Sequence, residues 1–329
     1  MLSIYSTKFE RARYKAGLFF GLLCSLSFLI SGCAQRLPVF SENPPRGIEL
    51  IDTPFFAQKE LQCGPAALAT VLTESGVETT PDRLSPQIFL PDRKGTLQLE
   101  LIGAVRRHGR VPYVIDPQPD ALVAQLLEDR PVLILQDLGA GPIRLYHYAV
   151  VIGILPGKKV VLRSGTEKRV ILNEDAFARS WQKAGNWGLV VLRPGELPGN
   201  ADLDRYVKAV AALESLGHRQ VAEQGYRAVL ARRPQHPAAL FGLGNGLLVK
   251  KEYGEAEKIY KKILAEQPDN PAVLNNLAEA LLRQGLRKEA LETIDRALSG
   301  PPLPPDLAEV LAQTRREIIA ASPSPASAQ

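Results

Sequence analysis

A period of 34 residues in the C-terminal part of the chain constrains the fold more than any other feature of the sequence. Proline recurs at this spacing at Pro234, Pro268 and Pro302. Alanine and leucine recur at the same spacing in further columns: Ala222, Ala256 and Ala290; Leu213, Leu247 and Leu281; Leu230, Leu264 and Leu298. Self-similarity at a fixed period indicates stacked copies of one supersecondary unit, which bury a continuous core between neighbours.

These columns resemble tetratricopeptide repeats, in which small residues lie where paired helices touch and proline ends each unit. The resemblance implies an all-α solenoid over residues 201–319, closed by a capping helix at residues 306–319. Stacked helix pairs form a surface for another protein or an extended peptide. The alternative is an array that only packs on the preceding domain. Residues 194–200 are a predicted linker, and the Ala-, Ser- and Pro-rich residues 320–329 are a predicted disordered tail.

The stretch Gln62–Leu68 places a cysteine at the start of an expected helix. Pro65 fits the first helical turn, where a missing N–H costs no hydrogen bond, and apolar residues recur at i, i+3 and i+4 from Leu68. The free N–H groups of a helix N-terminus favour an anion, and the thiolate is the nucleophilic form of cysteine. We therefore interpret Cys63 as a catalytic nucleophile. The alternative is a small buried cysteine with no chemical role.

His147 is the best candidate for a base that would serve this thiol. It opens the longest apolar run of the first domain, Tyr148–Ile154. His108 ends a predicted helix, and His218 and His236 fall in turns of the repeats. A Cys–His pair needs contact in space rather than in sequence. The alternative for His147 is a histidine satisfied within the core.

Three stretches together resemble the bacteriocin-leader-processing cysteine peptidases, which are papain-like domains: Gln58–Leu68, His147–Gly153 and Val160–Gly165. The likeness covers about Asp52 to Leu192. It implies that Cys63 is the nucleophile and His147 the base, and that the side chain of Gln58 donates to the oxyanion.

Two departures from the family pattern bear on activity. Gln58 stands five residues before the cysteine instead of six, and the adjacent Gln62 is a weaker alternative. Ser164 stands where the family has an aspartate; a hydroxyl can accept a hydrogen bond from imidazole but does not offset its positive charge. Asn186 is a remote candidate for the same role. Glu167 and Asp175 are weaker still, and the double-glycine specificity of the family is not carried over to this chain.

Residues 47–193 are predicted to form one α+β domain, a papain-like cysteine peptidase domain by the resemblance, with helices first and an antiparallel sheet later. After the Cys63 helix we expect helices at Leu97–His108, Asp120–Glu128 and Glu174–Lys183. We expect strands at Val111–Ile115, Val132–Gln136, Tyr148–Ile154, Val160–Leu162 and Leu189–Leu192.

The N-terminus predicts export and lipid attachment. Residues 1–32 combine four basic residues with an apolar run too short to be a confident membrane span, which is typical of a signal peptide. The run ends in Leu-Ile-Ser-Gly before Cys33, which resembles a bacterial lipobox. The resemblance implies a lipidated Cys33 on a tether, residues 33–46, and by the residue that follows, Ala34, an outer-membrane protein facing the periplasm. The alternative is a plain signal peptide or anchor with an incidental cysteine.

This prediction leaves Cys63 as the single thiol of the mature chain, because Cys24 would be removed and Cys33 acylated. A lone thiol in an oxidising compartment favours a nucleophile over a structural cysteine. We expect no metal and no other cofactor. The chain carries a net charge of +5, of which the signal contributes +3, and no basic stripe with interleaved aromatic residues, so we expect no nucleic-acid partner.

The sequence thus predicts a lipid-anchored cysteine peptidase whose repeats bind a substrate or partner. A catalytically inactive adaptor is the competing hypothesis, favoured by Ser164. Acyl transfer is a third, since an amine can resolve a thioester in place of water.

Overall fold

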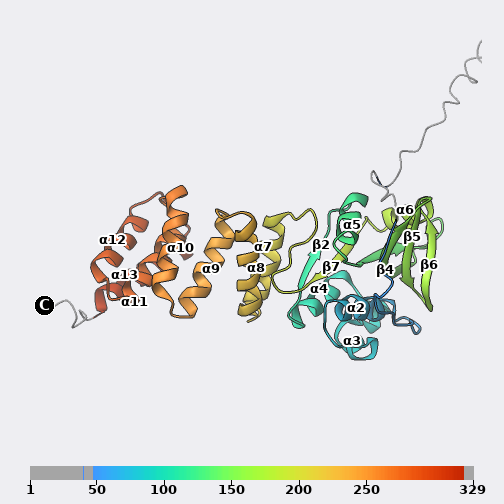
Figure 1. Cartoon of the computed structure of the whole chain (residues 1–329). Helices are drawn as coiled ribbons and strands as arrows, with labels where there is room; N and C mark the ends of the chain where they lie inside the picture. The colour runs from blue at the N-terminus through green and yellow to red at the C-terminus, as the bar shows by residue number, and fades with distance from the viewer. Residues whose placement is uncertain (1–39, 41–46, 322–329) are drawn as a thin grey trace, which may run out of the picture. The chain divides into compact units, whose positions relative to one another are not determined.

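The computed structural model describes residues 40 and 47–321 (Figure 1). The predicted signal peptide, Cys33, most of the tether and residues 322–329 of the predicted tail lie outside the described residues.

The first domain mixes helices and strands along the chain. Its elements are β1 (Ile48–Glu49), α2 (Cys63–Glu74), α3 (Pro81–Ile88), the 3-10 turn η1 (Pro91–Arg93), α4 (Gln98–Arg107), β2 (Val111–Val114), α5 (Pro119–Leu126), β3 (Val132–Asp137), β4 (Tyr146–Leu155), β5 (Lys159–Ser164), β6 (Glu167–Asn173), α6 (Glu174–Lys183) and β7 (Gly188–Leu192).

Within the described residues the strands form one antiparallel sheet in the order β2-β7-β3-β4-β5-β6, with β1 paired to β4. The register sets Gln136 opposite His147 and Val150 opposite Arg163. Since residues directly opposite each other share a face, this register decides which helices each side chain of β4 meets.

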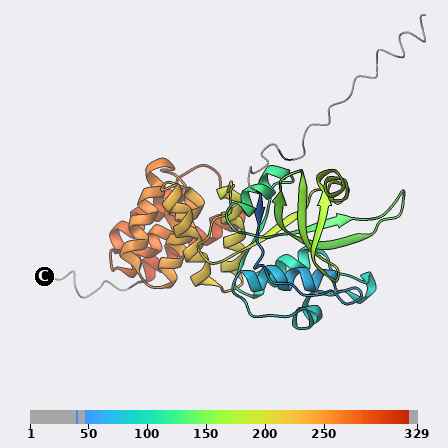
Figure 2. The ribbon, with the colours of Figure 1, turned by 45° about the vertical axis from the view of Figure 1, so that its right-hand side comes forward.

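The sheet lies between two layers of helices, α2, α3 and α4 on one side and α5 and α6 on the other (Figure 2). Tyr148, Val150 and Ile152 alternate along β4 and join Leu68 and Leu72 of α2 in one buried apolar cluster. The opposite face carries Gln136, whose side-chain amide donates to Ser180 Oγ of α6. β4 is therefore buried on both faces, which explains its continuous apolar sequence.

Seven helices follow: α7 (Leu203–Ser215), α8 (Arg219–Arg232), α9 (Pro237–Val249), α10 (Tyr253–Glu266), α11 (Pro271–Arg283), α12 (Arg287–Leu298) and α13 (Pro305–Ala320). Each helix packs on its successor, and the alanine column Ala222, Ala256 and Ala290 is buried between helices, whereas the prolines of the 34-residue period are exposed and follow helix ends. The predicted fold class is confirmed: an α+β domain with an antiparallel sheet, followed by an all-α repeat array.

Sequence reasoning missed four elements of the first domain, of which η1 is a turn of three residues. β6 has five exposed residues among seven, so it shows no apolar run. α3 contains an internal proline, Pro86, which argued against a helix. β1 has only two residues. Within residues 40 and 47–321, no helix is both long enough and apolar enough to cross a membrane.

Candidate active site

Cys63 is the first residue of α2 and is partly buried against the core of the domain. Gly64 allows the loop before α4 to close over this end of the helix, because a Cβ there would lie 2.7 Å from the Thr96 side chain. The side chain of Gln62 does not cap the helix. The first N–H groups of α2 thus have no side-chain partner from the N-cap residue and face an incoming acceptor.

Tyr148 connects this helix end to the start of β4. Its hydroxyl donates to the Thr96 carbonyl oxygen at 3.2 Å, and its ring packs edge-on against Trp187 with centroids 6.1 Å apart. Burial raises the pKa of the Tyr148 phenol, and the charge of a Cys63 thiolate raises it further. Cys63 therefore lies in electrostatic reach of the residue that follows His147.

His147 and Ser164 come together at the edge of the site. The ring Nε2 of His147 lies 2.9 Å from Ser164 Oγ, across the β4–β5 pair. Burial lowers the pKa of His147 below its usual value of 6.5. The ring is therefore a neutral imidazole near pH 7, the form that accepts a proton.

Gln58, in the segment before α2, contacts the backbone of β4 and of the turn after β5. Its backbone N–H donates to the Gly165 carbonyl oxygen at 3.0 Å, and its side-chain amide donates to the Tyr148 carbonyl oxygen at 3.4 Å. Together with Phe55, Phe56 and Ser164 it lines a small pocket over α2. The second N–H of the amide has no partner in these contacts, so it can serve an oxyanion.

Arg163 holds the segment that carries Gln58. The side chain is 5% exposed, and its guanidinium donates to the carbonyl oxygens of Ile51, Thr53 and Lys168. A buried charge needs such partners to offset its desolvation. Sequence reasoning missed this residue, since an arginine inside an apolar strand was the only signal.

The structure thus joins His147 to Ser164 by a hydrogen bond and ties Gln58 to the backbone of the neighbouring residues Tyr148 and Gly165. Among the described residues, the hydrogen bonds join His147 to Ser164 and Gln58 to the β4 backbone, and none joins Cys63 to the His147 ring. The catalytic pairing of Cys63 with His147 stays a prediction.

In the part of the chain that the structure describes, no hydrogen bond joins the weaker candidates Asn186, Glu167 and Gln62 to the His147 ring. The Asn186 amide donates to the Pro117 carbonyl oxygen, which leads away from His147. Glu167 lies opposite Ser164 in the β5–β6 ladder and is exposed. Gln62 Oε1 is buried without a hydrogen-bond partner. Residues 40 and 47–321 hold no cluster of three or more His, Cys, Asp or Glu side chains suited to a metal ion.

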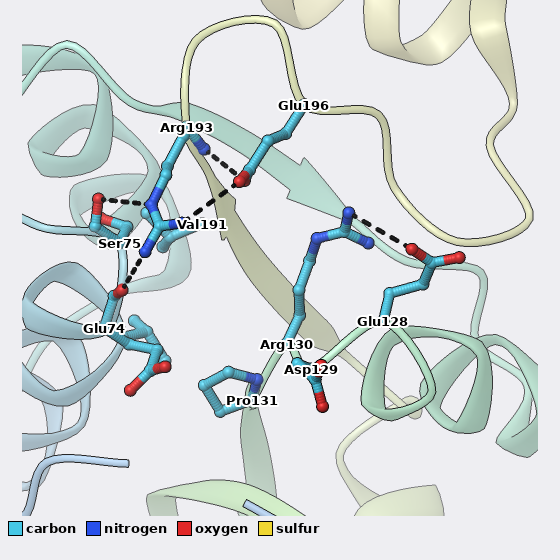
Figure 3. A pocket seen from close by; sticks show the side chains of 10 residues that line it. Glu74, Ser75, Glu128, Asp129, Arg130, Pro131, Val191, Arg193 and Glu196 are labelled. Atoms are coloured by element: carbon cyan, nitrogen blue, oxygen red, sulfur yellow. Dashed lines mark hydrogen bonds and ion pairs between the residues drawn. The ribbon is translucent and has the colours of Figure 1, made fainter. Parts of the chain in front are cut away.

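A larger cavity of about 210 Å³ lies at the opposite end of α2 (Figure 3). Arg193 spans its rim, donating to the Glu74 and Ser75 carbonyl oxygens and pairing with Glu196. Glu74 is eleven residues from Cys63, about 16 Å along a helix. This cavity is therefore separate from the thiol.

The repeats carry a second candidate surface. Asn245 Oδ1 of α9 accepts hydrogen bonds from Tyr260 Oη and from Asn276 Nδ2 of α11, both at 2.8 Å. Asn275 Nδ2 donates to Asn276 Oδ1 at 3.1 Å, while its own Oδ1 is buried without a partner. Side-chain amides of this kind pair with the backbone of an extended peptide.

In the described residues a cysteine begins a helix that packs on an antiparallel sheet, and the longest strand of that sheet, β4, has histidine as its second residue. This arrangement matches a papain-like cysteine peptidase fold. Family comparison agrees: residues 53–186 match the Peptidase C39 family, and residues 207–271 and 247–314 match two tetratricopeptide repeat models. The chain thus combines a Peptidase C39 family domain with tetratricopeptide repeats, which confirms the resemblance seen in the sequence.

Solved structures similar to parts of the chain include one for each domain. The peptidase domain of Streptococcus ComA, a bifunctional ABC transporter of a quorum sensing pathway, is 17% identical over 43% of this chain and 98% of that one, with a TM-score of 0.36. The Yersinia enterocolitica type III secretion translocator chaperone SycD, in complex with a peptide of the translocator YopD, is 18% identical over 36% of this chain and 92% of that one, with a TM-score of 0.33. A comparison with curated proteins finds no match.

Proposed function

We propose that the protein is a cysteine peptidase of the bacterial cell envelope, held by a lipid on Cys33 at the periplasmic side of the outer membrane, which hydrolyses peptide bonds through a thioester on Cys63. The observation that carries the proposal is the hydrogen bond between His147 and Ser164 at the start of β4, in a domain whose helix α2 begins with Cys63. The match of residues 53–186 to the Peptidase C39 family supports the same chemistry.

In the first step the Cys63 thiol proton passes to Nδ1 of His147 while the sulfur attacks the substrate carbonyl carbon. The other ring proton stays on Nε2, which donates a hydrogen bond to Ser164 Oγ, so Nδ1 is free to accept the thiol proton. The tetrahedral oxyanion accepts hydrogen bonds from the Gln58 amide and from the first N–H groups of α2.

The intermediate then collapses. The C–N bond breaks, the imidazolium of His147 protonates the leaving amine, and a thioester joins the acyl group to Cys63. Water attacks the thioester, His147 accepts its proton, and the carboxylic acid product leaves as the thiol re-forms. An amine in place of water would give acyl transfer.

The repeats supply the proposed binding surface for protein substrates or partners. The amides of Asn245, Asn275 and Asn276 form a continuous hydrogen-bonded row across α9 and α11. Such a row suits an extended peptide backbone. The double substitution Asn245→Ala with Asn276→Ala should raise KM for a protein substrate and leave short-peptide hydrolysis unchanged.

The test of the catalytic proposal uses chain 34–329, in which Cys63 is the single thiol. We expect alkylation by iodoacetamide near neutral pH to slow by about 100-fold in His147→Ala, since a positioned base contributes 10²–10⁴-fold. Products from a mixed peptide library, read by mass spectrometry, should vanish in Cys63→Ala. Equal alkylation rates with and without His147, and no products, would contradict the proposal.

A second function has one observation in its favour. Ser164 gives His147 a neutral partner instead of the carboxylate of an active triad. In that case the peptidase fold is inactive, and the protein acts as an adaptor through its repeats. The alkylation result distinguishes the two functions.

A further inference from the structure

The loop between β3 and β4 exposes apolar side chains that the catalytic proposal does not use. Leu138, Ile143, Leu145 and Tyr146 are 50%, 70%, 58% and 57% exposed. They belong to one projecting hairpin, closed by the Leu138 N–H donating to the Leu145 carbonyl oxygen and by the Asp137–Tyr146 pair. Exposed apolar side chains are ordinary when scattered, but a contiguous group marks an interaction site.

The charged groups described next to this hairpin are the Asp137–Arg144 ion pair and Lys183. Asp137 is its single acidic residue, is 1% exposed, and pairs with Arg144 at 2.7 Å while accepting the Gly139 and Leu145 N–H groups. Lys183 of α6 donates to the Gly139 carbonyl oxygen. The Arg144–Asp137 pair thus has no net charge, and Lys183 supplies a positive charge beside the apolar tip, a combination suited to an anionic lipid surface.

Phe40, the first described residue, contacts α6, and the hairpin contacts the same helix. Phe40 stacks on Phe177 of α6, and its N–H donates to the Glu174 carboxylate. Glu174 begins α6 and Lys183 ends it, about 14 Å away along the axis. Phe40 lies seven positions after the predicted lipid-bearing Cys33, a stretch of chain that spans at most about 25 Å.

We propose that the hairpin 138–146 inserts its apolar side chains into the bilayer and forms a second membrane contact beside the lipid. The short tether keeps the Phe40 end of α6 near the bilayer, and the hairpin at the other end of α6 supplies the apolar and cationic groups that a bilayer surface takes up. Tyr146 has the amphipathic ring that favours the headgroup level. His147 follows directly, so this contact would set the candidate site close to the membrane surface. The proposal rests on the lipid anchor of the proposed function, but not on peptidase activity.

The test measures vesicle flotation of chain 34–329, which lacks the lipid. All the described residues, from Phe40 on, belong to one compact unit, so we expect this chain to keep the fold. We expect binding to vesicles of phosphatidylethanolamine with phosphatidylglycerol, and weaker binding to phosphatidylcholine alone. Ile143→Asp should lower the partition coefficient by about tenfold or more, because an apolar contact is replaced by a charge. Leu99→Asp, a similarly exposed apolar position on α4 in the other helical layer, should leave it unchanged.

Three results would overturn the inference. The first is no binding to either vesicle, and the second is equal binding by wild type and Ile143→Asp. The third is a wild-type dimer in sedimentation that Ile143→Asp dissociates, which would make the hairpin a contact between copies. Loss of soluble-peptide hydrolysis in Ile143→Asp with unchanged flotation would assign the hairpin to substrate instead. Cys63→Ala should float like wild type, so failure of the catalytic proposal and failure of this one are told apart.

Discussion

The contacts within the two domains of this chain join residues at very different separations in sequence. In the repeats, each helix packs on the next one along the chain. In the peptidase domain, Arg163 binds a carbonyl oxygen 110 residues earlier, and Gln58 binds one 90 residues later. The repeats can therefore lose one unit interface at a time, whereas the candidate active site exists only when the whole domain is folded.

The largest expected effect concerns the single contact that distinguishes this site from an active triad. Ser164→Asp should raise the rate of peptide hydrolysis about tenfold or more, because a carboxylate stabilises the imidazolium that a hydroxyl leaves uncompensated. It should also raise the pKa of His147, measurable by NMR titration. Ser164→Ala is the matched control and should lower the rate. If Ser164→Asp leaves both quantities unchanged, the site is not catalytic.

The repeat domain should respond to a substitution that leaves the active site intact. A Cβ on Gly242 of α9 would lie 2.3 Å from the Tyr226 ring, so Gly242→Val should destabilise the repeats by about 1–3 kcal/mol. Thermal unfolding followed by circular dichroism should show this loss, with alkylation of Cys63 unaltered.

Gly246, on the same helix, offers the opposite control. No atom lies within 4 Å of the position of its Cβ, so Gly246→Ala should stabilise the repeats by about 0.5–1 kcal/mol. Equal effects of the two glycine substitutions would show that the packing of α9 against α8 is not as described.

These predictions reflect what the sequence contained. The 34-residue period was sufficient for the repeats, because each column reports a local contact between neighbouring helices. Cys63 and His147 were predicted from the helix start and the apolar strand, and the family resemblance added Gln58 and Ser164 with roles that no period or apolar pattern contains.

The remaining parts of the site left no pattern in the sequence. The roles of Tyr148 and Arg163 depend on strand register, which sets Val150 opposite Arg163 on the face toward α2. The fit of Gly64 against Thr96 joins the first turn of α2 to the loop before α4 and is visible only in three dimensions.

A pH dependence should appear in the peptidase domain. Burial lowers the pKa of His147, and burial with Arg107 and Arg110 lowers the pKa of His108. Below about pH 6.5 the unfolded chain therefore binds protons that the folded domain does not. The free energy of unfolding thus falls as pH falls, and this decrease is complete below the lowered pKa values of the folded domain.

The measurement is the unfolding midpoint of chain 34–329 between about pH 7.5 and pH 5.5, a window that lies above the usual carboxylate range. The double variant His108→Gln with His147→Gln should flatten this dependence. An unchanged slope in the double variant would assign the effect to other groups.

The smallest expected effect lies where α7 meets β2. Arg205 of α7 pairs with Asp116 at 2.6 Å, and both side chains are about half exposed. Asp116→Asn should therefore cost less than about 1 kcal/mol in thermal unfolding. A larger loss would mean that the two domains unfold as one unit, which would remove the contrast between them.

The hydrogen bonds from Arg163 to the carbonyl oxygens of Ile51 and Thr53 have a consequence for the order of events during synthesis. Cys63 leaves the ribosome one hundred residues before Arg163, and until then Thr53 has no guanidinium to hold it. A nascent or truncated chain that ends before β5 thus carries Cys63 while the Ile51 and Thr53 carbonyl oxygens lack these hydrogen bonds. The thiol is synthesised first, and the contacts that fix the segment preceding it form only after β5 has been synthesised.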